Sequence, residues 1–233
     1  MKAYVIHVSD AYDRERHMLK QLEDKALDVS FILDGDKKQL TPMQLEKYFK
    51  GEMAVASNRS SCALKHILAY EKLVCDGEDL VLILEDDIRF YKHFSVLNDI
   101  VAEVKQRGLA NFMISVEDSD LRYVPRSERK KGTLLYAQNG GRLAGAYLID
   151  RGGAESLLTS IQKEKIDIPI DWFHNKCVQA DIIKMYWSHP PIATQGSFDG
   201  SIDSLIDSGK HGFFRPYSVA LQKCYKKLLY ALR

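Results

Sequence analysis

The run LVLILEDD, residues 80–87, limits what this chain can fold into more than any other segment. Its five successive large aliphatic residues predict a strand that is buried on both faces of a sheet. The strand ends in three acids, Glu85, Asp86 and Asp87. Adjacent carboxylates repel one another, so a bound cation would explain the cluster, and an exposed acidic turn that stops the strand would explain it equally well.

The segments around this strand alternate between two kinds of secondary structure. Hydrophobic patterning predicts strands at 3–8, 29–33, 112–116, 143–149 and 182–187, and helices at 14–25, 61–74, 93–106, 154–161 and 172–178. Lys65 and His66 lie outside the apolar stripe of the helix at 61–74. The polar segment 35–57 is predicted to form a loop region with short helical pieces over the edge of the sheet. This alternation is typical of an α/β sheet with crossover helices.

Length and charge limit the classes of function. A chain of 233 residues can form one large domain, and a net charge of +1 argues against a surface for nucleic acids. The apolar run after Met1 is too short for a signal peptide or a membrane span, which predicts a cytoplasmic protein. Four cysteines lack the paired spacing of a zinc site and are expected to be reduced and mostly packing residues: Cys62, Cys75, Cys177 and Cys224.

The C-terminal segment differs in composition from the rest of the chain. Residues 210–233 contain six basic residues and no acid, interleaved with aromatic residues and leucines. We therefore divide the chain into a catalytic domain, 1–208, and a basic amphipathic tail, 209–233. The tail is expected to lie on the inner face of the cytoplasmic membrane, or else to pack on the domain as a helix with a solvated face.

Six segments between residues 3 and 205 occur in an order that identifies a family. They are VIHVSDAYDRERHM, ILDG, SSCALKHILAYEKLV followed by LVLILEDD, GAYLIDRGGAESLL, IPID and PPIATQGSFDGS. Together they resemble glycosyltransferase family 25, the lipooligosaccharide and collagen galactosyltransferase group. The chain departs from that pattern at Lys65, because a serine usually precedes the histidine that is His66 here.

The resemblance implies a GT-A-type fold, in which one domain has a Rossmann-type nucleotide-binding sheet and flanking helices. It also implies inverting transfer of a hexose, galactose from UDP-galactose, to a saccharide of bacterial lipooligosaccharide or lipopolysaccharide. A divalent ion, Mn²⁺ or Mg²⁺, would neutralise the departing diphosphate. Residues two apart in a strand face the same way, so Glu85 and Asp87 are the expected metal ligands and Asp86 is expected to contact the donor. The absence of clustered cysteines argues against zinc.

An inverting transfer needs a base that takes the proton of the acceptor hydroxyl. Asp171, in the segment IPID, is the first candidate because it matches the family's motif. It can equally be the N-cap of the helix that follows. Glu117 and Asp118 follow another predicted strand and remain alternatives.

The donor is expected at the carboxyl ends of the first strands, where nucleotides bind in open α/β sheets. This places six residues near the donor in addition to Asp86: His7, Val8, Arg14, Asp34, His66 and Gln195. Structural alternatives are an exposed charge for Arg14, a hydrogen bond to a backbone carbonyl for His66, and a routine loop contact for Gln195.

Four aromatic residues can stack on sugar rings, although core packing explains most of them equally well: Tyr147, Trp172, Trp187 and Phe198. Two other functions stay open. A metal-dependent nucleotidyl or phosphoryl transferase also needs acids at a strand end, but it usually has a glycine-rich or lysine-bearing phosphate loop, which this sequence lacks. A catalytically inactive sugar-binding module would not need the intact acids.

Overall fold

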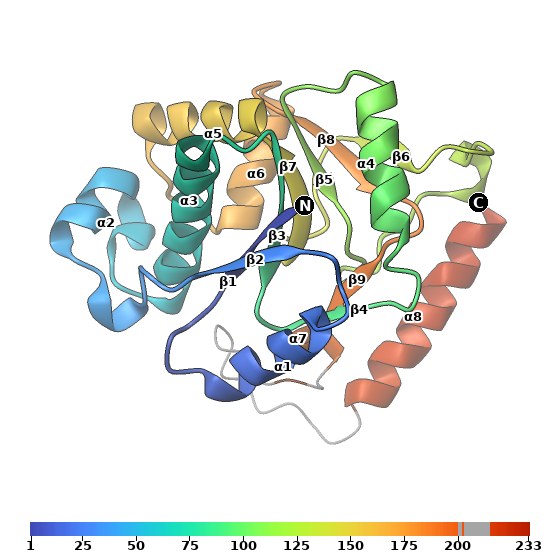
Figure 1. Ribbon diagram of the computed structural model, residues 1–233, viewed down its shortest axis with the longest axis horizontal. Coiled ribbons are helices and arrows are strands. Elements are labelled where there is room, and N and C mark those ends of the chain that lie inside the picture. The colour runs from blue at the N-terminus through green and yellow to red at the C-terminus, as the bar shows by residue number, and fades with distance from the viewer. Residues whose placement is uncertain (200–201, 203–214) are drawn as a thin grey trace.

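The computed structural model describes residues 1–199, 202 and 215–233 (Figure 1). A seven-stranded sheet forms its centre, in the order β2-β1-β3-β7-β5-β8-β6. The strands are β1 Lys2–Ile6, β2 Asp28–Ile32, β3 Leu80–Glu85, β5 Phe112–Ser115, β6 Leu135–Gln138, β7 Ala146–Asp150 and β8 Lys184–Ser188. β7 and β6 run antiparallel to their neighbours, and the other five share one direction. The predicted α/β class with one domain is confirmed.

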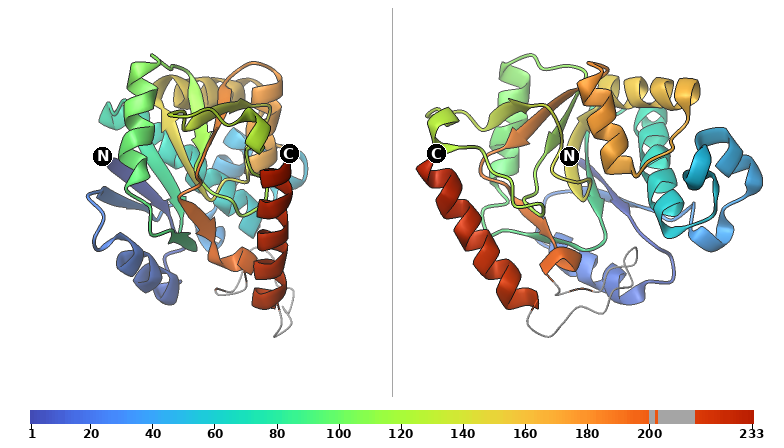
Figure 2. Two further views of the ribbon diagram at one scale, coloured as in Figure 1. Left: turned by 90° about the vertical axis from the view of Figure 1, so that its right-hand side faces the viewer. Right: turned by 180° about the vertical axis from the view of Figure 1, so that it is seen from behind.

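Helices cover both faces of this sheet. They are α1 Tyr12–Leu22, α2 Pro42–Tyr48, α3 Asn58–Asp76, α4 Val96–Gln106, α5 Arg151–Glu164, α6 Ile170–Gln179, α7 Gly196–Asp199 and α8 Arg215–Leu232, with short 3₁₀ turns at Lys37–Gln39, Gly51–Ala54 and Arg126–Glu128. α4 lies on one face and α3, α5 and α6 lie on the other (Figure 2). α2 and α8 lie at opposite ends of the molecule in both figures. No helix in the described ranges is both long and apolar enough to cross a membrane.

The alternation of side chains along β3 decides where its terminal acids point. Val81 and Ile83 belong to the apolar cluster under α3, α5 and α6, whereas Leu82 and Leu84 belong to the cluster under α1 and α4. Successive residues of a strand face opposite sides of the sheet. The last strand residue, Glu85, therefore faces α3.

α3 is the longest helix in the described ranges and is buried on almost every side. Ser57 caps its first turn in a reciprocal pair with Ser60, and Gly77 ends it with a left-handed φ of 72°. Lys65 and His66 lie outside its apolar stripe but are 1% and 0% exposed. The reason is that α3 contacts the sheet, both 3₁₀ turns of the segment 35–57, α5 and α6 at once.

A small second sheet was not predicted from the sequence. β4, Ile88–Phe90, pairs with β9, Ala193–Gln195, in antiparallel register. Each strand has three residues, too few for a readable pattern, and their partners are about a hundred residues apart in the chain. This pairing matters for the site because it places Gln195 opposite Ile88, directly after the three acids.

Candidate active site

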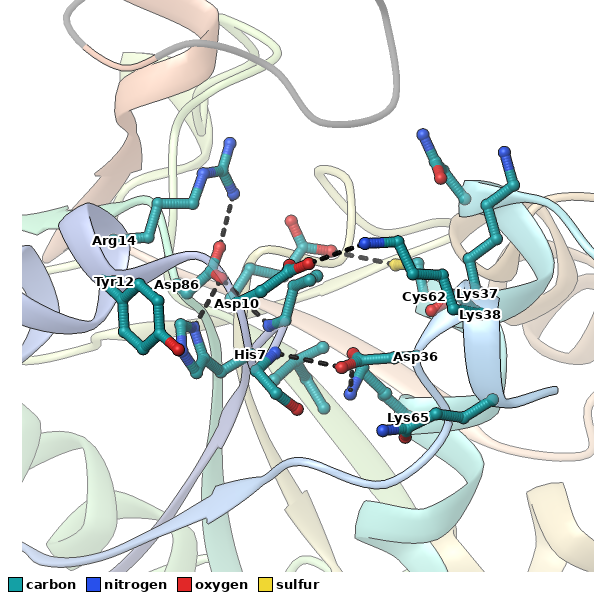
Figure 3. Close-up of a pocket in the computed structure, with 17 residues that line it drawn as sticks. His7, Asp10, Tyr12, Arg14, Asp36, Lys37, Lys38, Cys62, Lys65 and Asp86 are labelled. Atoms are coloured by element: carbon teal, nitrogen blue, oxygen red, sulfur yellow. Dashed lines mark hydrogen bonds and ion pairs between the residues drawn. The ribbon is translucent and has the colours of Figure 1, made fainter.

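A cavity of about 460 Å³ opens at the carboxyl ends of β1 and β3 (Figure 3). Its walls come from the loop after β1 with the start of α1, from the segment after β2, from the first half of α3, and from the end of β3. Charged residues are concentrated here: Asp10, Arg14, Asp36, Lys37, Lys38, Lys65, Glu85 and Asp86. A cavity with convergent polar groups at this edge of an α/β sheet is the usual place for a nucleotide.

Asp86 joins the β1 side of the cavity to β3. Its Oδ2 lies 2.9 Å from His7 Nδ1 and 3.4 Å from the backbone N of Val8, and its Oδ1 pairs with Arg14. Burial alone would raise the pKa of the Asp86 carboxyl, but the hydrogen bond from His7 and the charge of Arg14 outweigh it and lower that pKa. The structure thus brings together four of the predicted donor residues in one charged network.

The second wall is held by an ion pair that the sequence did not predict. Lys65 Nζ lies 2.9 Å from Asp36 Oδ1 and donates to the carbonyls of Leu33 at 2.6 Å and Asp34 at 3.1 Å. Asp36 Oδ2 also accepts from the backbone N of Ser9. Lys65 therefore fixes the loop after β2 against the loop after β1, and this role explains a buried lysine on α3.

Asp34 itself does not line the cavity. Its side chain is exposed, and it takes part through its carbonyl oxygen. Asp36, two residues after the predicted Asp34, is the acid that lines the cavity. The reason is that the chain turns at Gly35, whose φ is 91°, before Asp36 points inward.

Glu85 lies at the meeting point of three elements. Its Oε1 is 3.4 Å from His66 Nε2 and 3.6 Å from Cys62 Sγ, both on α3. Its Oε2 accepts from Gln195 Nε2 at 3.3 Å. Burial, followed by the charge of Glu85, raises the pKa of the Cys62 thiol well above its usual value. His66 and Gln195 are thus placed at Glu85, as neighbours of the expected metal ligand.

The surroundings of Asp87 show whether a cation fits between Asp87 and Glu85. It is 3% exposed, and its Oδ1 is buried without a hydrogen-bond partner. Burial and then the negative charge of Glu85 raise the pKa of Asp87 to about 6. An unpartnered buried oxygen next to a second carboxylate is destabilising unless a cation lies between them. The residues present therefore fit a divalent ion at Glu85 and Asp87.

Gly145 is required for this arrangement. A Cβ atom at position 145 would lie 2.0 Å from Gln195 Nε2, well inside contact distance. Because Gly145 has no side chain, Gln195 can cross its backbone and reach Glu85.

Asp171 is the candidate base whose carboxylate is neither completely buried nor held by a cation. It is half-buried in the first turn of α6, and the N-cap of that helix is Pro169, so Asp171 is not the capping residue. Burial raises its pKa, partly opposed by hydrogen bonds from the backbone N–H groups of Trp172 and Asp171, and the nearby charge of Glu85 raises it further. Asp171 does not line the cavity, but the charge of Glu85 acts on it, and an aspartate with a raised pKa is suited to accept a proton.

Glu117 is completely buried and used for structure. Its Oε1 accepts from the backbone N–H groups of Gly145 at 2.7 Å and Ala146 at 3.1 Å, and its Oε2 accepts from the Ser119 hydroxyl. Burial raises its pKa well above the usual value, against the opposing hydrogen bond from Ser119. Glu117 holds the strand start that carries Gly145 and does not reach the cavity.

Asp118 is also buried completely, and it binds the C-terminal helix. Its carboxylate accepts from Tyr91 Oη at 2.8 Å and Tyr123 Oη at 3.1 Å, and it pairs with Lys223 Nζ on α8 at 2.6 Å. Neither alternative base is therefore available to an acceptor hydroxyl.

The aromatic candidates separate clearly by exposure. Tyr147 and Trp187 are 2% and 7% exposed and pack in the core, whereas Trp172, next to Asp171, is 62% exposed. The Phe198 side chain lies outside the described part of the chain.

The four cysteines are free, as expected, but two of them do not pack in the core. Cys75 and Cys224 are exposed, whereas Cys177 is buried and Cys62 is half-buried. The one sequence signal for a role of Cys62 is its spacing of four residues from His66, which places both on one side of a helix.

Comparisons with known proteins agree with the resemblance seen in the sequence. Residues 1–174 match the sequence model of glycosyltransferase family 25, described as an LPS biosynthesis protein. A glycosyltransferase 25 family member from Aedes aegypti is 28% identical over 185 residues, which are 72% of this chain and 29% of that protein. Procollagen galactosyltransferase 1 from Danio rerio is 25% identical over 210 residues, 82% of this chain and 33% of that protein. The chain thus spans about a third of the length of these relatives.

Solved structures are more distant. Mouse xyloside xylosyltransferase 1 in its apo form aligns with 78% of this chain and 70% of its own, at 10% identity and a TM-score of 0.42. A197 from STIV aligns with 90% of this chain and 97% of its own, at 12% identity and a TM-score of 0.43. Scores this low add nothing to the assignment.

Proposed function

The chain belongs to glycosyltransferase family 25, and from this premise we propose that its cavity transfers a hexose from a nucleotide sugar to a saccharide acceptor. The observation that carries the proposal is the pair of Glu85, which lines the cavity, and Asp87, two residues further on, whose buried carboxylate oxygen lacks a hydrogen-bond partner. The galactosyltransferase relative supports UDP-galactose as donor, and the family's link to LPS biosynthesis supports a bacterial lipooligosaccharide or lipopolysaccharide as acceptor.

Glu85 and Asp87 are the residues that would hold Mn²⁺ or Mg²⁺. The ion, when bound, neutralises charge on the diphosphate leaving group. Around it, Arg14, His7 and Asp86 form one wall and Lys37 and Lys38 line the other, so the cavity offers cations on both sides of a diphosphate (Figure 3). Asp86 is held by His7 and Arg14 and faces the cavity, where it can accept from a donor hydroxyl. This arrangement is what the proposed GT-A-type reaction requires.

Asp171 is proposed as the base of an inverting displacement. Its oxygen takes the proton of the attacking acceptor hydroxyl as the bond to the sugar's anomeric carbon forms and the bond to the diphosphate breaks. The exposed ring of Trp172, the next residue, offers an apolar face to the acceptor sugar. Both residues support an acceptor position at the start of α6.

A nucleotidyl or phosphoryl transferase is the weaker alternative. Such enzymes commonly hold phosphates in a glycine-rich loop at a helix N-terminus. The cavity is instead lined by side-chain cations, and Gly35 is the only glycine between β2 and the 3₁₀ turn that begins at Lys37. An inactive sugar-binding module would not need a metal ion, so it would not explain why a buried oxygen of Asp87 lacks a hydrogen-bond partner.

Helix α8 supports a membrane location for the acceptor. The surface that would contact the membrane is an apolar stripe, and not the basic face that the sequence suggested. Lys223 and Lys227 point toward Asp118, at 2.6 Å and 3.9 Å, and Lys223 is largely covered by this contact, whereas Lys227 stays exposed. The exposed side instead carries an apolar stripe at intervals of four, three and four residues: Leu221, Tyr225, Leu228 and Leu232, between 60% and 78% exposed. The exposed basic residues Lys226 and Arg233 lie beside this stripe.

An apolar helix face with flanking cations is suited to the surface of an anionic bilayer. We therefore propose that the apolar stripe of α8 contacts the surface of the cytoplasmic membrane that carries a lipid-linked acceptor. Sedimentation with phosphatidylglycerol vesicles tests it: the wild type is expected to pellet with the vesicles, and the Leu221→Ser/Leu228→Ser variant is not. Leu19→Ser, which removes an exposed leucine of α1, is the control. Equal pelleting of all three proteins, or a dimer in solution that the double variant abolishes, would overturn the membrane assignment.

The transfer reaction is tested by screening UDP-hexoses for UDP release with Mn²⁺ and either a lactose-type or a glucose-terminated acceptor. We expect release with UDP-galactose that depends on both metal and acceptor. Tight binding of carbohydrate without release of UDP from any donor would favour the sugar-binding module.

A further inference from the structure

Cys62, His66 and Glu85 form a group of three possible metal ligands beside the cavity. Cys62 Sγ, His66 Nε2 and Glu85 Oε1 all lie within 4.8 Å of one another, the one group of this kind in the described ranges. Cys62 and His66 are four residues apart on α3, and Glu85 ends the neighbouring strand. Cys62 and Glu85 also line the cavity, so an ion can reach them from solvent.

The two separations that involve Glu85 match those around a tetrahedral zinc ion. Bond lengths of about 2.3 Å to sulfur and about 2.1 Å to nitrogen or oxygen place the ligand atoms about 3.4–3.6 Å apart. The observed values are 3.4 Å from His66 Nε2 to Glu85 Oε1 and 3.6 Å from Cys62 Sγ to the same oxygen. The histidine distance exceeds that of a good N–H···O hydrogen bond, which is about 2.7–3.2 Å.

A buried hydrogen-bond chain orients His66 from behind. His66 Nδ1 lies 2.7 Å from Tyr147 Oη, Tyr147 Oη lies 2.8 Å from Tyr70 Oη, and Tyr70 Oη lies 2.7 Å from His174 Nε2. All four side chains are at most 2% exposed. A metal-binding histidine usually has its second ring nitrogen fixed in this way.

The donors and acceptors in this hydrogen-bond chain can be ordered so that His66 is able to bind a metal. His174 Nε2 lies 2.7 Å from Tyr70 Oη, a distance at which this ring nitrogen can accept from the Tyr70 hydroxyl. Tyr70 then accepts from Tyr147, which accepts from His66 Nδ1–H. This order leaves a lone pair on His66 Nε2, the form of imidazole that binds a metal.

From this geometry we propose that Cys62, His66 and Glu85 form a zinc site with a fourth position open to the cavity. A thiolate, an imidazole and a carboxylate suit zinc better than manganese or magnesium. Binding replaces the proton of the Cys62 thiol, which is released to solvent. This proposal departs from the expectation that the cysteine pattern argues against zinc, because the third ligand comes from a strand and not from a second cysteine.

The site is separate in function from the ion proposed for sugar transfer. Both need Glu85, so zinc held by Cys62 and His66 keeps Glu85 from the ion at Asp87. Inhibition of sugar transfer by zinc rests on the proposed function, whereas the zinc site itself does not, since its ligands can be tested without donor or acceptor.

Cobalt titration of the full-length metal-free protein tests the site, because cobalt replaces zinc and its bond to a thiolate absorbs in the near ultraviolet. We expect the wild type to develop this band and lose it when zinc is added. Cys62→Ser is expected to lack the band, while Cys75→Ser and Cys224→Ser, which change exposed cysteines, retain it. No band in the wild type, or an unchanged band in Cys62→Ser, would overturn the proposal.

Alkylation of the wild type keeps the test valid if Cys62→Ser does not fold. Zinc is expected to slow alkylation of Cys62 and to leave Cys75 and Cys224 unaffected, as read by peptide mass spectrometry. Equal labelling of Cys62 with and without zinc would contradict the site.

Tyr147 is a positioning residue in this proposal. Tyr147→Phe removes the hydroxyl that holds His66 Nδ1, so we expect the cobalt affinity to fall about tenfold while the band is retained. Unchanged affinity would show that the chain does not orient His66.

Discussion

Gln195 Nε2 donates to Glu85 Oε2 at 3.3 Å, although the two residues are 110 positions apart in the chain. The contact depends on Gly145, whose missing side chain leaves the space that Gln195 occupies. The position of Glu85 at the end of β3 therefore depends on both Gln195 and Gly145.

Gly145→Ala is expected to lower the turnover of the donor. The new methyl group displaces Gln195 from Glu85, and the loss of one hydrogen bond to a charged group corresponds to about a tenfold change or more. Gly152→Ala, in helix α5 with its nearest neighbour at 3.4 Å, is the control and should keep full turnover. Combining Gly145→Ala with Gln195→Ala should add little to either change alone, and additive losses would contradict the coupling.

Asp87→Asn is expected to raise the melting temperature of the metal-free protein at neutral pH. The pKa of Asp87 is about 6 in the folded state against 3.8 ordinarily, so between these values the folded protein binds a proton that the unfolded chain does not. Stability from this group therefore increases as the pH falls through 6, and the ionised form is destabilising at pH 7.5. Asparagine removes that charge, and a gain of about 2–4 °C corresponds to about 1 kcal/mol.

The pH dependence of this gain is the decisive feature. We expect the difference in melting temperature between Asp87→Asn and the wild type to disappear as the pH is lowered from 7.5 to 5. The same variant should bind Mn²⁺ more weakly, since it loses a charged ligand. Asp99→Asn, an exposed acid on α4, is the control. A difference that stays constant over this pH range would show that Asp87 does not titrate as described.

How much of this site could be predicted from the sequence differs from residue to residue. The strand 80–87 and the alternation of its side chains are local properties, so the separate directions of Glu85 and Asp86 could be foreseen. The ion pair of Lys65 with Asp36 could not, because it depends on the turn at Gly35 and on the packing of α3. Likewise, Glu117 and Asp118 looked like catalytic acids until burial and their partners showed otherwise.

The fold shows the same division. Long patterned segments such as 61–74 were predicted within a few residues, whereas β4, β6 and β9 were not. Each of these has three or four residues, and its stability comes from a partner strand that is distant in sequence. The side of α8 that faces the protein also depended on a distant partner, the buried Asp118.

Asp171→Asn is expected to lower kcat about 100-fold or more while leaving the affinity for UDP unchanged, because asparagine cannot accept the acceptor's proton. Since the pKa of Asp171 is raised by burial, the wild-type rate should fall at a higher pH than for an ordinary aspartate as the solution is acidified. Asp167→Asn, which changes an exposed acid just before α6, is the matched control. An Asp171→Asn enzyme with wild-type kcat would exclude it as the base.

Lys223→Met is expected to loosen helix α8 from the domain. The substitution leaves the buried carboxylate of Asp118 without its nearest cation, and breaking a buried pair costs about 3 kcal/mol or more. Hydrogen exchange should show faster exchange in residues 218–232, with Lys226→Met, an exposed cation of the same helix, as the control. Equal protection in both variants would mean that other contacts hold α8.

Isothermal titration of UDP with and without Mn²⁺ tests the central claim most directly. If Glu85 and Asp87 hold an ion that binds the diphosphate, manganese should tighten UDP binding to the wild type about tenfold or more. The Glu85→Gln/Asp87→Asn variant should bind UDP with the same weak affinity in both conditions. UDP affinity that is independent of manganese in the wild type, or a manganese effect that persists in the double variant, would contradict the account.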